Sequence, residues 1–178
     1  MVPFHTIGHP GAGKTTLTAD LTRKLTQMGF RVGTIKHSAH VHELDKPGKD
    51  SFIHRNAGAS AAAMVTKDLA AVYLPRTDEI SVDYLLEHHY RHLDISLIEG
   101  WISGPYKKIE IWRQATGRRP LFTEIDNTTA LITDDPLLKH EDLTASRKGI
   151  ARFDFSQTPK LVQWLLLKID SKAWGSKS

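Results

Sequence analysis

A glycine-rich segment near the start of the chain constrains the fold more than any other part of the sequence. Residues 8–16 read Gly-His-Pro-Gly-Ala-Gly-Lys-Thr-Thr and match G-x-x-x-x-G-K-[ST], the Walker A pattern of a phosphate-binding P-loop. The segment lies between an apolar run at residues 4–7 and an amphipathic stretch at residues 15–28. Because a P-loop needs a strand before it and a helix after it, this context disfavours a chance match.

The residue types of this segment fit a nucleoside triphosphate. Glycines let backbone N–H groups turn inward onto phosphate oxygens, and the helix N-terminus that follows favours an anion. Lys14 is expected to reach the β- and γ-phosphates, and Thr15 to offer its hydroxyl to Mg²⁺. The predicted nucleotide-binding residues of the loop are Gly8, Pro10, Gly11, Ala12, Gly13, Lys14, Thr15 and Thr16.

Short apolar runs alternate with amphipathic stretches along the rest of the chain, which is typical of βαβ units around a mainly parallel sheet. Further strands are predicted at residues 31–35, 95–98, 108–112 and 131–133, and a hairpin at 61–66 and 70–74. Helices are predicted at residues 50–58, at 81–92 and from Thr158 onward, with a long polar loop at 36–49.

We therefore expect an α/β protein with the three-layer P-loop NTPase fold, in which helices flank a mainly parallel central sheet and a small β-hairpin extends from it. Residues 1–170 are expected to form a single nucleotide-binding domain, followed by a frayed tail at 171–178.

Composition favours a cytoplasmic protein. The 178 residues include no cysteine, no signal-like N-terminus and no apolar stretch of the roughly 20 residues that span a bilayer. The net charge of +4 is compatible with phosphate ligands. Lysines and arginines are scattered and not interleaved with aromatics, so we expect neither nucleic acid nor a membrane as a partner.

Carboxylates near predicted strand ends are the candidate metal ligands. Glu99 ends the apolar run at residues 95–98, and Gly100 allows close backbone approach, so Glu99 is predicted to serve Mg²⁺ with Thr15. A solvated strand-end Glu is the alternative. Asp50 is the second candidate for metal binding and catalysis, and it equally fits a helix cap.

The choice between GTP and ATP depends on a carboxylate near the base. Guanine presents two donors that one Asp can accept, and Asp134 follows the strand predicted at residues 131–133, at the end where α/β proteins bind ligands. The alternative for Asp134 is a turn before Pro136.

Several segments together resemble the molybdopterin-guanine dinucleotide biosynthesis protein B (MobB) family of P-loop GTP-binding proteins. Besides residues 8–16, they are Val-Gly-Thr-Ile-Lys-His at 32–37, Asp-Lys-Pro-Gly-Lys-Asp-Ser at 45–51, His-Arg-Asn-Ala-Gly-Ala at 54–59, Ile-Glu-Gly at 98–100 and Lys-Lys-Ile-Glu at 107–110. The resemblance covers about two thirds of the chain. Residues 101–106 depart from it where a shorter turn is expected.

This resemblance implies a homodimeric, weakly hydrolysing GTP-binding accessory protein. It would assist the guanylyltransferase that joins GMP to molybdopterin, and molybdopterin or its guanine dinucleotide is a further implied ligand. Nucleotide binding carries over to residues 8–16, a Mg²⁺-linked role to Glu99, and a substrate-loop role to Lys36, His37, Asp50 and Arg55.

Two other functions stay open. A P-loop small-molecule kinase using ATP would carry an arginine-rich lid, for which Arg118 and Arg119 are the nearest candidates. A pure binding module would use GTP only to order the loop at residues 36–49. Arg55 or Arg113 from a neighbouring subunit could act as an arginine finger.

Overall fold

The computed structural model describes residues 1–75, 77 and 80–175 and divides the chain into two compact units. The first unit combines Met1–Ser38 with His88–Ser178, and the second is Ala39–Glu87. In the sequence the second unit lies between the two parts of the first, and it contains the predicted hairpin. The single nucleotide-binding domain over residues 1–170 stays a prediction. Within the described residues, no helix is both long and apolar enough to cross a membrane.

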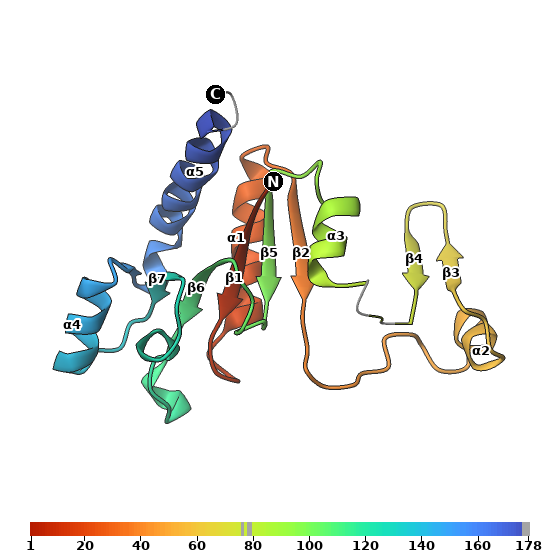
Figure 1. Ribbon diagram of the computed structural model, residues 1–178, viewed down its shortest axis with the longest axis horizontal. Helices are drawn as coiled ribbons and strands as arrows, with labels where there is room; N and C mark the ends of the chain where they lie inside the picture. The colour runs from red at the N-terminus through yellow and green to blue at the C-terminus, as the bar shows by residue number, and fades with distance from the viewer. Residues whose placement is uncertain (76, 78–79, 176–178) are drawn as a thin grey trace. The chain divides into compact units, whose positions relative to one another are not determined.

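The first unit is built on a six-stranded sheet in which every neighbouring pair of strands is parallel (Figure 1). In sheet order the strands are β2 (Val32–Lys36), β5 (Ile95–Glu99), β1 (Val2–Ile7), β6 (Lys107–Ile111), β7 (Thr128–Ile132) and β8 (Ala151–Phe153). The prediction of a mainly parallel sheet is confirmed. Because all strands run the same way, their carboxyl ends meet at one edge.

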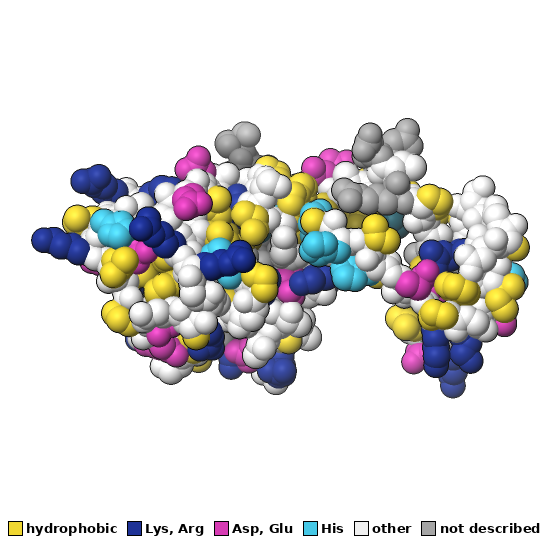
Figure 2. Space-filling view, turned by 90° about the horizontal axis from the view of Figure 1, so that it is seen from below, with side chains coloured by type: hydrophobic (Ala, Val, Ile, Leu, Met, Phe, Trp, Pro, Cys, Tyr) yellow, Lys and Arg dark blue, Asp and Glu magenta, His cyan; other side chains and the backbone are white. Residues whose placement is uncertain are grey.

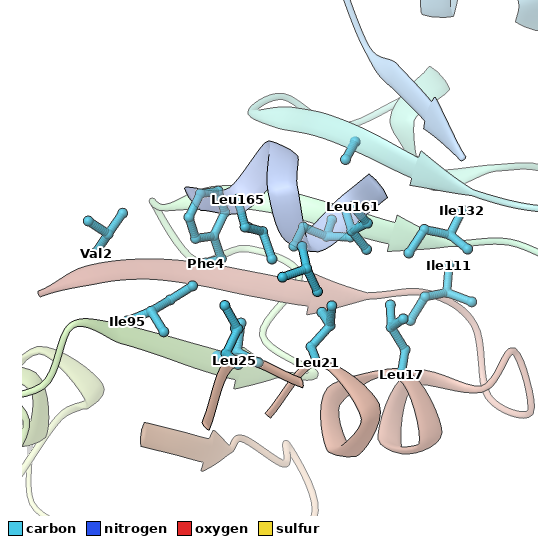
Figure 3. Packing of buried hydrophobic residues seen from close by; sticks show 14 of the residues in the cluster. Val2, Phe4, Leu17, Leu21, Leu25, Ile95, Ile111, Ile132, Leu161 and Leu165 are labelled. Carbon is cyan, nitrogen blue, oxygen red and sulfur yellow. The ribbon is translucent and has the colours of Figure 1, made fainter. Parts of the chain in front are cut away.

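Two helices, α1 (Lys14–Gln27) and α5 (Thr158–Gly175), cover one face of this sheet (Figure 3). Leu17, Leu21 and Leu25 of α1 recur at helical spacing and are almost wholly buried. They share one cluster with Leu161 and Leu165 of α5 and with alternate residues of the strands, such as Phe4, Ile95 and Ile111. The helix α5 extends past residue 171, where the tail was predicted to begin, and residues 176–178 lie outside the described part of the chain.

The opposite face carries a second, smaller core of Trp112, Phe122, Leu131, Ala145 and Ile150. Ala145 belongs to helix α4 (Lys139–Arg147), which the sequence analysis missed together with strand β8. Three 3-10 turns complete this unit: η1 (Gln114–Thr116), η2 (Leu121–Thr123) and η3 (Phe155–Gln157).

The second unit contains helix α2 (Asp50–Asn56), the antiparallel hairpin of β3 (Ala62–Val65) and β4 (Ala70–Tyr73), and most of helix α3 (Val82–His88). The predicted hairpin is confirmed. Helix α3 is shorter than predicted, because the following residues turn so that Tyr90 and Leu93 pack against Gly33, where an added Cβ would come within 2.6 Å of both side chains.

The alternative that Asp50 caps the helix at residues 50–58 is wrong, because Asp50 is the first residue of α2 and not its cap. Lys49 is the N-cap residue, in extended conformation and without a side-chain capping hydrogen bond. The buried Ser51 hydroxyl instead donates to Asp45 Oδ1, 3.0 Å away, because Asp45 folds back against the first turn of the helix.

Candidate nucleotide-binding site

The candidate site lies at the carboxyl edge of the parallel sheet. The P-loop follows β1, Lys36 ends β2, Glu99 ends β5 and Arg113 follows β6 closely. Figure 2 shows the molecule from the side toward which the strands of the parallel sheet point in Figure 1. Positively and negatively charged side chains both lie on that surface. Open parallel sheets bind ligands at this edge.

The P-loop adopts a conformation that requires its glycines. Gly8, Gly11 and Gly13 have φ angles of 150°, 79° and 104°. A Cβ on Gly8 would lie 2.3 Å from the carbonyl oxygen of Ile111, so this glycine lets the loop pass the end of β6. A turn closes between His9 and Ala12, and Gly13 begins the first turn of α1 by accepting from Leu17 N. The loop therefore leads directly into a helix N-terminus, as anion binding requires.

Lys14 is held over the loop. Its ammonium donates to the carbonyl oxygens of Gly8 and His9 at 2.9 and 3.0 Å. Burial lowers the pKa of Lys14, and the positive charge of Lys36 lowers it further, while Glu99 opposes both effects. These two contacts fold the Lys14 side chain back over the main chain of the P-loop. The ammonium group therefore lies at the loop itself.

Thr15, Glu99 and Lys36 meet at one carboxylate oxygen. Thr15 Oγ1 donates to Glu99 Oε1 at 2.9 Å, and the Lys36 ammonium forms an ion pair with the same oxygen. Lys36 and Glu99 are register partners on the adjacent strands β2 and β5, so the sheet itself places them side by side. The Glu99 side chain is 7% exposed and the Lys36 side chain 61%, so the carboxylate is buried beneath an exposed cation.

The oxygens of Thr15 and Glu99 fit Mg²⁺ as a ligand pair. Mg²⁺ prefers hard oxygen ligands at about 2.1 Å in an octahedron, so two neighbouring ligands lie about 3 Å apart. The 2.9 Å between Thr15 Oγ1 and Glu99 Oε1 matches this separation. Together they would hold Mg²⁺, which would supply positive charge beside bound phosphates.

Buried polar contacts keep this arrangement rigid. Beneath the loop, Thr6 Oγ1 of β1 and Thr18 Oγ1 of α1 are hydrogen-bonded at 2.9 Å. Behind Glu99, Gly100 has a φ of 92°, and a Cβ there would lie 2.7 Å from the His37 carbonyl oxygen. His37 N also donates to Glu99 O at 2.8 Å, and the His37 ring stacks on Trp101. The turn at Gly100 thus ties the ends of β2 and β5 together.

Arg113 was considered as a finger from another subunit, but it contacts the P-loop of its own chain. Its Nε donates to Ala12 O at 3.2 Å, and its guanidinium lies 3.9 Å over the ring of Phe155. On the same side, His9 Nε2 is 2.8 Å from Arg119 O. These contacts have no local sequence pattern, because they join segments about a hundred residues apart.

The remaining predicted site residues fall in two groups. Asp134 is exposed just beyond β7, at the same edge of the sheet, and its Oδ1 accepts from Phe155 N at 2.9 Å. This contact joins residues 21 positions apart, so it is a tertiary contact and not the predicted turn before Pro136, and it engages one carboxylate oxygen. Asp50 and Arg55 belong to the second unit, where Arg55 donates to Glu43 at 2.9 Å and lies over the Tyr73 ring. Their roles toward a nucleotide stay predictions.

A cavity of about 420 Å³ adjoins the site between α1 and β2. It is lined by Thr15, Thr18, Ala19, Thr22, Arg23, Thr34, Ile35, Lys36 and Glu99. Three of these residues, Thr15, Lys36 and Glu99, also form the carboxylate cluster. The cluster therefore opens onto a space large enough for side chains to rearrange.

Comparison with known proteins gives one family for most of the chain. Residues 4–134 match the model of MobB, described as molybdopterin guanine dinucleotide synthesis protein B. A molybdopterin-guanine dinucleotide biosynthesis adapter protein of Haemophilus influenzae is 38% identical over 132 residues, which is 73% of each chain. The protein of the same description from Escherichia coli is 36% identical over 131 residues, covering 71% of this chain and 75% of its own.

Solved structures show the same fold. Bacillus subtilis MobB superposes with a TM-score of 0.70 at 24% identity, covering 93% of this chain and 96% of its own. A MobB homolog from Bacillus stearothermophilus gives a TM-score of 0.65 at 22% identity, covering 96% and 99%. With the parallel sheet and the P-loop, these matches confirm the predicted P-loop NTPase-like α/β fold.

Proposed function

Because this chain belongs to the MobB family, we propose that it is a GTP-binding adapter protein of molybdopterin guanine dinucleotide biosynthesis. In this role it acts in the cytoplasm as a homodimer. It binds Mg²⁺ with the nucleotide and assists the guanylyltransferase that joins GMP to molybdopterin. The relatives described as adapter proteins support the pathway and the accessory role.

The proposal of nucleotide binding rests above all on the 2.9 Å contact between Thr15 and Glu99 beside the P-loop. In this reading, the amides of residues 8–16 cradle the phosphates and the Lys14 ammonium neutralises them. Thr15 and Glu99 offer their oxygens to the metal. An accidental glycine-rich turn would not need a buried carboxylate at hydrogen-bond distance from the Ser/Thr position of the motif.

Hydrolysis of GTP is slow in this proposal. An arginine that reaches the transferred phosphate contributes about 10³–10⁵ in rate. Arg113, the arginine found at the P-loop, is instead bound to Ala12 O and stacked on Phe155. A slow site suits an adapter in which the bound nucleotide, more than its turnover, controls contact with a partner.

Two measurements test the proposal. The purified chain is titrated with GTP and ATP by calorimetry, with and without Mg²⁺, and tagged guanylyltransferase is then used to retain the chain in the presence of each nucleotide. We expect GTP to bind more tightly than ATP in a Mg²⁺-dependent way, and the guanylyltransferase to retain the chain. A preference for ATP together with phosphorylation of a metabolite would support the kinase instead, and the absence of nucleotide binding would refute the proposal.

A further inference from the structure

The surroundings of Lys36 indicate a role beyond its ion pair with Glu99. Its ammonium pairs with Glu99 Oε1, the oxygen that also accepts the Thr15 hydroxyl. An ion pair with so exposed a lysine contributes little to stability, about 0–1 kcal/mol. The pairing therefore does not by itself explain why a lysine stands at this position.

Two lysines lie near Glu99 at this site. Lys36 contacts Glu99 Oε1 together with Thr15, the residue that follows Lys14, and Lys14 donates to the main-chain carbonyls of Gly8 and His9. Lys36 therefore acts electrostatically on the same region as the P-loop lysine. The local excess of positive charge favours a ligand with more negative charge than one carboxylate supplies.

Lys36 lies where its ammonium group could turn from Glu99 toward a bound polyphosphate. A metal ion held at Glu99 Oε1 would repel the ammonium group that now contacts this oxygen. The flexible four-carbon stem of Lys36 and its 61% exposed side chain leave that group room to move. A metal held by Thr15 and Glu99 would lie beside the terminal phosphates, so the same ammonium group would stand near the end of the polyphosphate.

We propose that Lys36 is the residue that makes this site discriminate a nucleoside triphosphate from a diphosphate. Lys36 holds Glu99 in the absence of nucleotide and contacts the γ-phosphate once a triphosphate binds. The inference rests on the proposed nucleotide-binding function and deepens it. Nearby arginines are less suited, because Arg23 pairs with Asp20 and Arg113 is fixed on Ala12 and Phe155.

The test compares GTP and GDP affinities in the full chain carrying Lys36→Met. Methionine keeps an unbranched side chain and removes the charge. Calorimetry with Mg²⁺ present should show GTP binding weakened about tenfold or more and GDP binding changed less than about twofold. Lys24→Met is the matched control, because Lys24 forms a half-buried ion pair with Asp20 further along α1 and does not line the cavity. It should change neither affinity.

The outcomes separate the two claims. If Lys36→Met weakens GTP and GDP equally, or weakens neither, the role in discrimination is refuted while GTP binding by the wild type still supports the proposed function. If the wild type itself binds no nucleotide, the proposed function fails and the inference with it. Thermal unfolding of each variant shows that the measured chains are folded, and Lys36→Arg should restore most of the discrimination because it restores the charge.

Discussion

Thr15 and Glu99 stand 84 residues apart in the chain, yet the threonine hydroxyl donates to the carboxylate at 2.9 Å. The contact exists because β1 and β5 are adjacent parallel strands, with Thr6 and Glu99 in register, and both end at the same edge of the sheet. The P-loop then carries Thr15 onto the first turn of α1. The second unit separates β2 from β5 in the sequence, and these two strands pair directly with each other.

Replacing Glu99 by Gln should remove the Mg²⁺ dependence of GTP binding. The amide keeps an oxygen for the Thr15 hydroxyl but loses the charge that attracts the metal. We expect Mg²⁺ to enhance GTP affinity about tenfold less than in the wild type. Calorimetric titration at fixed GTP with varied Mg²⁺ measures this, with the exposed Glu124→Gln as control. An unchanged Mg²⁺ response would exclude Glu99 from the metal site.

Replacing Lys14 by Ala should weaken GTP binding about 100-fold or more, because a charge-assisted hydrogen bond contributes about 1.5–3 kcal/mol and Lys14 is proposed to donate to the polyphosphate. Among the described residues its ammonium bonds to the Gly8 and His9 carbonyls, so the fold should survive. Equilibrium binding of labelled GTP, with Lys24→Ala as control, provides the measurement. Undiminished affinity would place the phosphates elsewhere.

Much of this site follows from the sequence, because its residues act through local patterns. The P-loop spacing predicted Lys14 and Thr15, and a carboxylate after a buried run predicted Glu99. The Lys36–Glu99 pair was not predicted, because it depends on the register between two strands that lie 63 residues apart. The contacts of Arg113 with Ala12 and of His9 with Arg119 were also not predicted, because each joins segments that lie far apart in the sequence.

The missed elements have weak periodicity. Helix α4 reads Lys-His-Glu-Asp-Leu-Thr-Ala-Ser-Arg, and of its residues only Glu141 and Ala145 are buried. Its start is set by Glu141 Oε2 accepting from Leu138 N at 2.9 Å, which no Ser, Thr, Asp or Asn at the cap position announces. Strand β8 has only three residues. Such elements are stabilised by tertiary packing more than by their own sequence.

The backbone of Gly8 gives a stability prediction that needs no ligand. Gly8→Ala places a Cβ 2.3 Å from Ile111 O at a φ of 150°, so the loop or β6 must shift. We expect a loss of about 2–3 kcal/mol in the free energy of unfolding. Gly11→Ala is the control, because no atom lies within 4 Å of its Cβ; at a φ of 79° it should cost only about 1–2 kcal/mol. Urea denaturation of both variants measures the difference, and equal losses would contradict the close approach.

Because of Glu110, the free energy of unfolding should fall as the pH rises toward neutrality. This fully buried carboxyl accepts from Leu121 N and Phe122 N, which lower its pKa, but burial outweighs them and raises the pKa to about 7. The folded chain therefore holds a proton that the unfolded chain, with an ordinary pKa of 4.5, releases. The contribution is complete below pH 4.5 and is lost as the pH rises to about 7.

The difference between wild type and Glu110→Gln isolates this effect. Each unit of pKa shift corresponds to 1.36 kcal/mol, so the stability difference should change by about 2–3 kcal/mol across the window. Gln accepts only one of the two backbone hydrogen bonds, which lowers stability at every pH without adding a slope. Urea denaturation at several pH values from 4.5 to 8 checks it, and parallel profiles would mean that Glu110 is ionised throughout.

Base selectivity offers a prediction for Asp134, whose carboxylate already accepts from Phe155 N through one oxygen. Guanine requires a carboxylate to accept two donors together, whereas the contact with Phe155 N occupies only one oxygen. Asp134→Asn keeps an oxygen for Phe155 N but presents an amide donor in place of the second oxygen. If Asp134 contacts the base, the ratio of GTP to ATP affinity should fall about tenfold or more.

Asp135→Asn is the matched control for this measurement. Asp135 lies next in the chain and accepts from Gln114 N at 2.8 Å, so it likewise holds a backbone amide 21 residues away through one oxygen. Its replacement should leave the affinity ratio unchanged. Competition binding of GTP and ATP to both variants decides the matter. A ratio that falls equally in both would indicate a displaced loop, and a ratio that falls in neither would leave Asp134 with the Phe155 contact alone and move the base contact to another residue.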